Sequence, residues 1–253
     1  MHPIIRLVNR NLTISLNPGF LIWQIIFPLI YIFVAGFAYT SLIKEVPFGE
    51  KDLAYPAFLA SGMIGFNIMN STLVSGIIIW NDRRHGMFEQ IMSGPFTRAH
   101  YVFSNIVTIG IVGLISATLI AFVGYPVFFE SVEFSLFTIP MIVFAAITGS
   151  ILFGSIASII STRIRSSEGF NVIINTAFLF FAFVSTAFYP AEGAPEPLAS
   201  VFYVNPLTYL VDVVRAGIFG NITEFVIVEM GVLAVLASIL FVVATKLLTR
   251  LDF

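Results

Sequence analysis

Two opposite charges stand out in the last third of this sequence, because the residues around them are almost all apolar. Asp212 and Arg215 lie three residues apart within Leu207 to Phe219. Side chains at this spacing share one face of a helix, so the carboxylate and the guanidinium can form an ion pair. We expect the pair to hold this stretch in place and to perform no reaction; the alternative is two independent solvated charges.

The sequence lacks the residues of a nucleotide-hydrolysing or hydrolytic site. A P-loop requires a glycine immediately before its lysine, whereas the three lysines here follow Ile43, Glu50 and Thr245. Neither H-E-x-x-H nor G-x-S-x-G occurs, cysteine is absent and the three histidines form no ligand cluster. We therefore predict that the chain has no catalytic residue and binds no metal or cofactor itself.

Most of the chain consists of apolar blocks with the length of a membrane-spanning helix. A helix needs roughly 20 apolar residues to cross the bilayer core, and only 10% of the residues are charged. The six blocks are Phe20 to Ile43, Tyr55 to Trp80, Val102 to Phe129, Phe134 to Ser161, Gly169 to Tyr189 and Phe225 to Leu248. The sequence therefore predicts an all-α integral membrane protein with six transmembrane helices.

Lysine and arginine fall on alternate gaps between these blocks. One side of the membrane would hold nine of the twelve, namely Arg6, Arg10, Arg83, Arg84, Arg98, Arg163, Arg165, Lys246 and Arg250. The other side keeps Lys44, Lys51 and Arg215. Cytoplasmic loops carry the excess of basic charge, so we predict a multi-pass protein of the cell membrane with both termini cytoplasmic. The net charge of −2 gives no support for nucleic-acid binding.

Carboxylates are nearly absent from the middle of the apolar blocks. Glu168 and Glu229 are the nearest exceptions, and we expect both to lie near membrane surfaces. A carrier coupled to protons or ions would normally place Asp, Glu or His along its path. The pattern therefore argues against such a carrier.

Residues 3–17 have the pattern of an amphipathic helix on the inner membrane surface. Apolar side chains recur at helical spacing, and polar ones occupy the opposite side: Ile4, Ile5, Val8 and Leu12 against Arg6, Arg10, Thr13 and Asn17. The arginines would face anionic headgroups; the alternative is a frayed tail. Asn17 then caps the first span, which begins at Pro18.

The longest cytoplasmic gap, residues 81–100, predicts a short helix ended by Gly94-Pro95. One face of this helix is apolar and consists of Met87, Phe88, Ile91 and Met92. Exposed apolar residues rimmed by charge are typical of a surface that docks another protein. The alternative is a helix that lies on its own membrane or bundle.

Polar and small side chains inside the blocks form two further patterns. The polar ones should face protein or a wet pathway, with packing hydrogen bonds as the simpler interpretation of each: Asn67, Asn70, Ser71, Ser75, Asn171 and Asn175. The small ones recur every four residues in the fourth block: Ala146, Ser150, Gly154, Ser158 and Thr162. Such a column allows close helix approach, and we favour packing within the chain over a dimer contact.

Between the fifth and sixth blocks the composition changes, with several prolines from Pro190 to Pro206. The apolar stretch that follows has roughly 13 residues, too few to cross a membrane. We expect residues 190–222 to form a re-entrant or interfacial helix on the outer side, buried against the bundle.

Three segments resemble the ABC-2 type exporter permeases, and together they cover nearly the whole chain. The first is Asp82 to Pro95, which follows the second block. The second is Ser161 to Glu168 followed by Asn171, the link between the fourth and fifth blocks. The most specific is Phe188-Tyr189-Pro190 with Val204 to Arg215, which is similar to the family's outer motif of a proline, N-P-x-x-Y and a downstream arginine.

The resemblance implies roles for two sets of residues. Coupling to an ATPase subunit would involve Asp82, Arg83, Arg84, Gly86, Met87, Phe88, Glu89, Ile91, Met92 and Pro95. The outer re-entrant helical hairpin would contain the motif residues Tyr189, Pro190, Asn205, Pro206, Tyr209, Asp212 and Arg215. Many members have a Ser-Gly pair shortly before the aromatic-proline, whereas Ser185 is followed here by Thr186, so the local helix can differ at this point.

The resemblance also implies partners and a function. The whole chain, 1–253, would be one transmembrane domain that works with a separate ABC ATPase subunit, a second permease copy or homologue, and membrane lipid. ATP and Mg would be bound by the ATPase. We expect the permease subunit of an exporter that moves a drug, lipid, glycan or other amphiphile outward. The alternatives are a secondary carrier or channel not coupled to ATP and, more remotely, a membrane-embedded enzyme.

Overall fold

The computed structural model describes residues 3–16, 18–40, 42–43, 45–48, 51–73, 75–128, 136–164, 166–191 and 194–249. The helices and strands, in chain order, are α1 Pro3–Ser15, α2 Pro18–Thr40, β1 Glu45–Phe48, β2 Lys51–Ala54, α3 Tyr55–Leu73, α4 Ser75–Arg84, α5 Met87–Met92, α6 Arg98–Phe128, α7 Thr138–Arg163, α8 Ser167–Phe183, α9 Glu196–Phe202, α10 Pro206–Phe219 and α11 Glu224–Thr249. The predicted Asn17 cap, Arg165, Arg250 and Lys44 lie outside the described residues.

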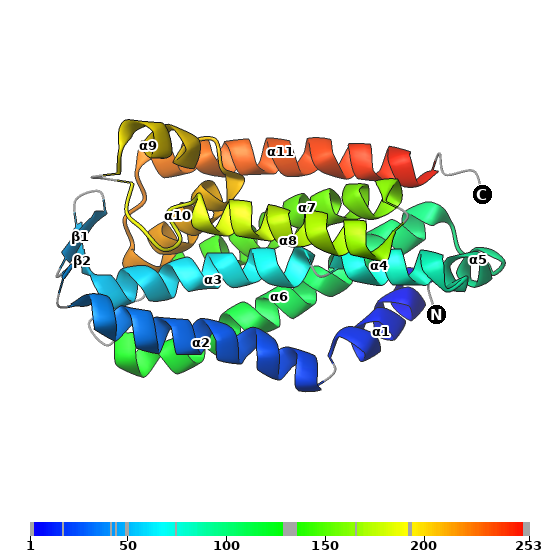
Figure 1. Cartoon of the computed structure of the whole chain (residues 1–253), viewed down its shortest axis with the longest axis horizontal. Coiled ribbons are helices and arrows are strands. Elements are labelled where there is room, and N and C mark those ends of the chain that lie inside the picture. Colours follow the sequence, from blue (N-terminus) through cyan, green and yellow to red (C-terminus); the bar gives the residue numbers. More distant parts are fainter. Residues whose placement is uncertain are drawn as a thin grey trace.

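The long helices run side by side along the long axis of the molecule (Figure 1). Helix α5, helix α1 and the C-terminal part of α11 lie at one end, which we call the α5 end. The strands and α9 lie at the opposite end, which we call the hairpin end. Helix α7 forms the centre of the bundle, because it packs against α3, α4, α6, α10 and α11.

Each of the six apolar blocks is helical over most of its described length, but not every helix is long and apolar enough to span a membrane. Among the described residues, four are: Tyr55–Arg84, Arg98–Gly124, Thr138–Arg163 and Glu224–Leu248. Two others are apolar but shorter, namely Gln24–Thr40 within α2 and α8. The structure thus gives four candidate spans, or five if α9 and α10 count as one, and the predicted number of six is not confirmed.

The short length of α8 has a local cause. Its apolar block runs to Tyr189, but the helix ends at Phe183 and the chain turns through 184–189. Apolar composition continues through this turn, so the sequence pattern does not mark where the helix stops. Helices α9 and α10 then meet at an angle of 74°, a bend that fits the predicted re-entrant segment and equally a broken span.

The prediction of an all-α fold misses one element, a two-stranded antiparallel hairpin between α2 and α3. Its register pairs Val46 with Leu53 and Pro47 with Asp52. Val46 and Leu53 are both buried, so one face of the hairpin covers the core at the hairpin end. Strands of four residues are too short for an alternating pattern to be recognised beside the longer apolar blocks.

Small residues allow the close packing at the centre of the bundle. The column predicted in the fourth block lies on α7 and is buried throughout: Ala146, Ser150, Gly154, Ser158 and Thr162. This confirms the prediction of packing within the chain. Helix α3 uses glycine in the same way, because a Cβ at Gly62 would collide with the carbonyl oxygen of Ala187 and one at Gly65 with Val211.

Helix α1 is present as predicted. The face that packs on the protein, however, is not the predicted apolar stripe of Ile4, Ile5, Val8 and Leu12. Leu7, Asn11 and Ser15 are buried, and α1 packs against α6. The Asn11 side chain donates a hydrogen bond to Oδ1 of Asn105 at 2.9 Å. Ile5, on the predicted apolar stripe, is 47% exposed. The other residues of the stripe, Ile4, Val8 and Leu12, are partly buried, so the stripe lies beside the protein contact and is only partly open to the surroundings.

Candidate functional site

The segment that connects α4 to α6 forms a tight corner at the α5 end. Helix α4 ends at Arg84, and Gly86 has φ of 70°, a left-handed conformation that glycine adopts without steric cost. Helix α5 follows immediately and ends at Met92, before the turn at 93–95. The predicted short helix is therefore present, between Gly86 and the Gly94-Pro95 pair that was predicted to end it.

Asp82, one of the residues predicted to couple to an ATPase subunit, is buried and serves as an internal anchor. It is 6% exposed and accepts two hydrogen bonds from Arg10, at 2.6 Å and 2.9 Å. The hydroxyl of Tyr101 donates a third at 2.8 Å. The hydrogen bond to Asp82 raises the pKa of Arg10, because it favours the charged guanidinium. One carboxylate thus joins α1, α4 and α6.

The apolar face of α5 folds onto the bundle, as in the alternative described above. Phe88 is 2% exposed and meets the ring of Tyr101 edge to face, with centroids 5.1 Å apart. Ile91 and Met92 are partly buried against the same small cluster, which also contains Ile79 and Val102. Three of the four predicted apolar docking residues therefore stabilise the position of α5.

The remaining residues of the segment form a mainly polar outer surface, which we call the α5 surface. Its exposed members are Arg84, His85, Gly86, Met87, Glu89, Gln90, Ser93, Gly94 and Pro95. Arg84 lies over the ring of Trp80 at 5.0 Å. Arg83 is partly buried and donates a hydrogen bond to the carbonyl oxygen of Ser161, which lies in the last turn of α7. Of the ten predicted coupling residues, those on the α5 surface can reach another protein.

At the hairpin end, Asn205 and Pro206 begin α10 and attach it to α8. The Asn205 side chain accepts a hydrogen bond from the backbone N–H of Leu207 at 2.9 Å, an N-cap contact. Its amide nitrogen donates to the carbonyl oxygens of Phe181 and Val184 at the end of α8. Pro206 occupies the first turn, where its missing N–H has no cost.

Arg215 is buried at the centre of a network that fixes α10 to α3 and to the turn after α8. It forms the ion pair with Asp212 that their spacing predicts, at 3.2 Å. Two of its partners, Ser61 and Phe58, are residues that the sequence did not mark: Nε donates to Ser61 Oγ, Nη2 donates to the carbonyl oxygen of Phe58, and the guanidinium lies over the Phe58 ring at 3.6 Å. Nη2 also donates to the carbonyl oxygen of Thr186.

Thr186, which replaces the glycine common in the resembled family, contributes directly to this network. Its hydroxyl donates a hydrogen bond to Oδ1 of Asp212 at 3.2 Å, while its carbonyl accepts from Arg215 at 2.7 Å. The other motif residues lie nearby: Tyr209 donates to the carbonyl of Tyr203, Tyr189 is 44% exposed, and Pro190 lines an adjacent cavity.

The polar residues predicted inside the blocks do not form one site. Asn67 is fully buried, and neither atom of its side-chain amide has a hydrogen-bond partner in the part of the chain that the structure describes. Ser71 donates to the carbonyl oxygen of Asn67, and Asn70 is partly buried. Asn171 and Asn175 are exposed on α8. The side chain of Ser75 lies outside the described residues. The expected packing bond is thus missing for Asn67.

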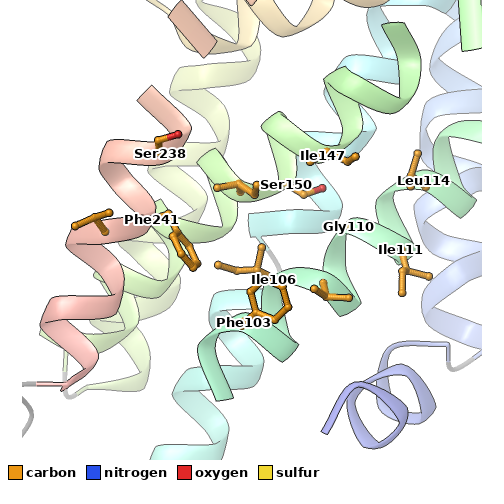
Figure 2. Close-up of a pocket in the computed structure, with 12 residues that line it drawn as sticks. Phe103, Ile106, Gly110, Ile111, Leu114, Ile147, Ser150, Ser238 and Phe241 are labelled. Atoms are coloured by element: carbon orange, nitrogen blue, oxygen red, sulfur yellow. The ribbon is translucent and has the colours of Figure 1, made fainter. Parts of the chain in front are cut away.

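An apolar groove of about 490 Å³ lies between α6, α7 and α11. Figure 2 shows Phe103 and Ile106 of α6, Ile147 and Ser150 of α7, and Phe241 of α11 converging on it. The Ser150 hydroxyl is buried at its wall and has no hydrogen-bond partner among the described residues. Sequence reasoning could not find this groove, because Phe and Ile are abundant in every block.

Most of this chain matches one known family of membrane proteins, both in a family model and in individual relatives. The model of the ABC-2 type transporter family matches residues 4–219. Nodulation protein J of Rhizobium leguminosarum bv. viciae is 24% identical over 225 residues, covering 88% of this chain and 84% of that protein. The transport permease ycf38 of Cyanophora paradoxa is 27% identical over 209 residues, covering 79% of this chain and 68% of that protein.

Proposed function

Because this chain belongs to the ABC-2 type transporter family, whose members are membrane subunits of ABC transporters, we propose that it is the permease of an ATP-driven exporter. A separate ABC ATPase subunit would bind ATP and Mg and would dock on the α5 surface. The chain itself would supply no catalytic residue. The observation that carries this proposal is the attachment of an exposed corner, through buried side chains, to helices α1, α4 and α6.

The attachment explains how docking could move the permease. A force on exposed residues such as Glu89 or Met87 passes through the buried Phe88 to Tyr101 on α6. Tyr101 and Arg10 both bind Asp82 at the end of α4. Helices α1, α4 and α6 would therefore respond together when the ATPase subunits close on ATP. A loosely attached corner would absorb the same displacement without transmitting it.

The distribution of basic residues supports a cytoplasmic position for the α5 end. The described basic residues predicted on the inner side lie on the elements that meet there: Arg6, Arg10, Arg83, Arg84, Arg98, Arg163 and Lys246. Both ends of the chain would then face the cytosol, and the hairpin end would lie at the outer surface of the membrane. This arrangement needs an even number of crossings, and we propose six, with α2 and α8 as two of them. At 1.5 Å per residue the 17 residues of α8 extend about 26 Å, close to the bilayer core of about 30 Å.

The outward face of α8 supports a second permease copy or homologue as a partner. Asn171 and Asn175 are exposed there beside Val172, Ile173 and Leu179. Amide side chains directed into lipid are costly, so they normally face protein or a water-filled path. A second permease packed on α8 would provide either environment, with membrane lipid around the rest of the bundle.

The substrate class remains broad in this proposal: a drug, lipid, glycan or other amphiphile. The groove between α6, α7 and α11 is lined almost entirely by hydrocarbon, which suits an acyl chain or another apolar group. The second candidate function is a secondary carrier or channel that works without ATP. Asn67, buried without a hydrogen-bond partner among the described residues, is the observation that would fit a wet pathway of either kind.

Purification of the chain with an ABC ATPase subunit, followed by reconstitution into vesicles, tests the proposal. We expect ATP-dependent export, and ATPase activity that rises with the transported compound among candidate lipids, glycans and drugs. An ATPase subunit with its nucleotide site inactivated is the control. Transport that continues at the same rate with this inactive subunit would replace the exporter with the carrier or channel.

A further inference from the structure

A second cavity, of about 380 Å³, lies at the hairpin end beside the Arg215 network. Its lining includes three charged residues and several aromatic rings: Phe48, Phe58, Asp212, Arg215, Phe225 and Glu229. The rim is held in place, because Asn221 donates a hydrogen bond to the carbonyl oxygen of Phe48 at 2.7 Å. Phe225 is 55% exposed at this rim, so the cavity communicates with the surface.

Glu229 on α11 is the unusual member of this lining. It is 2% exposed, and its Oε2 atom has no hydrogen-bond partner among the residues that the structure describes. Buried carboxylates are normally paired or hydrogen-bonded, because removing them from water is costly. An unsatisfied carboxylate oxygen that lines a cavity therefore points to a missing partner.

Arg215 does not provide that partner. Four of its donated hydrogen bonds go to Ser61, Asp212, Phe58 and Thr186. Its charge is balanced by Asp212, and within the described chain no ion pair reaches Glu229. The two charges of the network cancel, so within the described chain neither of them serves as a counter-charge for Glu229, and a bound cation could provide one.

We propose that this cavity binds an organic ammonium group, with Glu229 as its counter-ion and the aromatic rings of Phe48 and Phe225 around its alkyl part. Carboxylates and aromatic faces together suit ammonium groups. A metal ion fits less well, because divalent cations prefer several oxygen ligands and the described residues contain no group of three His, Cys, Asp or Glu that could hold one. The ammonium group could belong to a free amine or to the headgroup of a membrane lipid.

Binding can be measured on the full chain in nanodiscs of phosphatidylglycerol, without an ATPase subunit and without any transport step. Ethanolamine is titrated in one arm and short-chain phosphatidylethanolamine in the other, by calorimetry. We expect saturable binding of one molecule per chain in at least one arm. Binding of ethanolamine would identify a free amine as the ligand, and binding of phosphatidylethanolamine alone would identify a lipid headgroup. Ethylene glycol, a neutral molecule of similar size, should not compete with either ligand.

The variant Glu229→Gln should weaken binding at least tenfold, while Glu224→Gln, at an exposed carboxylate at the start of the same helix, should bind as the natural chain does. If Glu229→Gln fails to fold, the ethylene glycol comparison on the natural chain still decides. Absence of saturable binding in both arms, equal binding of ethylene glycol, or unchanged binding by folded Glu229→Gln would overturn the proposal. ATPase stimulation is a separate measurement, so either proposal can fail alone.

Discussion

At the scale of single residues, Asp82 shows how a charge near an exposed corner can serve the interior. Its carboxylate accepts hydrogen bonds from both Arg10 and Tyr101, and it is almost completely buried. The family resemblance implied a coupling residue, and the sequence does not show on which side of α4 the carboxylate lies. The structure makes it a link between helices that are distant in the sequence.

We predict that Asp82→Asn lowers the stability of the protein by roughly 1–3 kcal/mol, because hydrogen bonds to charged groups of this kind contribute about that much. Arg10 is 25% exposed in its side chain, so water can replace part of the lost interaction and the lower half of the range is expected. Thermal unfolding of the purified protein measures the change. Asp52→Asn, at an exposed position on β2, is the control and should leave the unfolding temperature unchanged.

The second prediction concerns Asp212 and Arg215. Removing one partner of a buried pair leaves the other charge uncompensated, which costs about 3–5 kcal/mol. We expect Arg215→Gln to be the more damaging change, since Arg215 also bonds to Ser61, Phe58 and Thr186. A double-mutant cycle with Asp212→Asn, read by unfolding temperature and folded yield, should give a coupling energy of about 0.5–3 kcal/mol. Additive effects would instead mean that the two charges act independently.

Side-chain spacing could predict the pair but not the rest of its network. Asp212 and Arg215 are neighbours on one helix, so their distance follows from helical geometry. The carbonyl oxygens of Phe58 and Thr186 are backbone groups that every residue has, and only the folded chain shows which of them are unsatisfied. The same limit explains why Glu229 was expected near a membrane surface but not as a buried, unpaired carboxylate.

At the scale of elements, α5 separates into an inner and an outer face, and the two faces lead to different expectations. Glu89 lies on the exposed face, whereas Phe88 is buried against Tyr101. Only changes on the outer face should affect the ATPase contact without affecting the fold of the permease.

We predict that Glu89→Lys weakens binding of the ATPase subunit by about 1–3 kcal/mol and reduces export, while the protein still inserts into the membrane. A reversed charge at a docking surface removes favourable contacts and adds repulsion. A pull-down assay with the ATPase subunit and an export assay measure both effects. Glu168→Lys, exposed at the start of α8 near the same end of the molecule, is the matched control. Normal binding and export by Glu89→Lys would show that the ATPase docks elsewhere.

Long elements could be predicted from the sequence better than short ones. Long apolar blocks gave helices, and the composition change at Pro190 marked the segment that bends by 74°. The hairpin was missed because each strand has four residues, and the end of α8 was misplaced because the turn after it is also apolar. In both cases the deciding interactions come from residues far away, such as Asn205, which bonds to the end of α8.

At the scale of the whole molecule, two independent observations fit one orientation. The sequence assigns nine basic residues to one side and three to the other. The structure brings α1, α5 and the C-terminal part of α11 to the same end of the bundle, with the hairpin and α9 at the opposite end (Figure 1). An even number of crossings satisfies both. The four candidate spans given by helix length and composition meet this condition, as would six, whereas the five obtained by counting the bent pair as a span do not.

The last prediction tests the number of crossings. If α2 and α8 cross and the bent pair re-enters, the chain crosses six times. Helix α8, at about 26 Å, is slightly shorter than the bilayer core, and local thinning of the bilayer can accommodate it. The chain has no cysteine, so single cysteines can be labelled without background. In intact cells, Ser93→Cys and Lys246→Cys should resist a membrane-impermeant maleimide, while Asp52→Cys and Glu196→Cys, exposed at the hairpin end, should react. Labelling of Lys246→Cys from outside would mean an odd number of crossings, and α9 with α10 would then be a complete span.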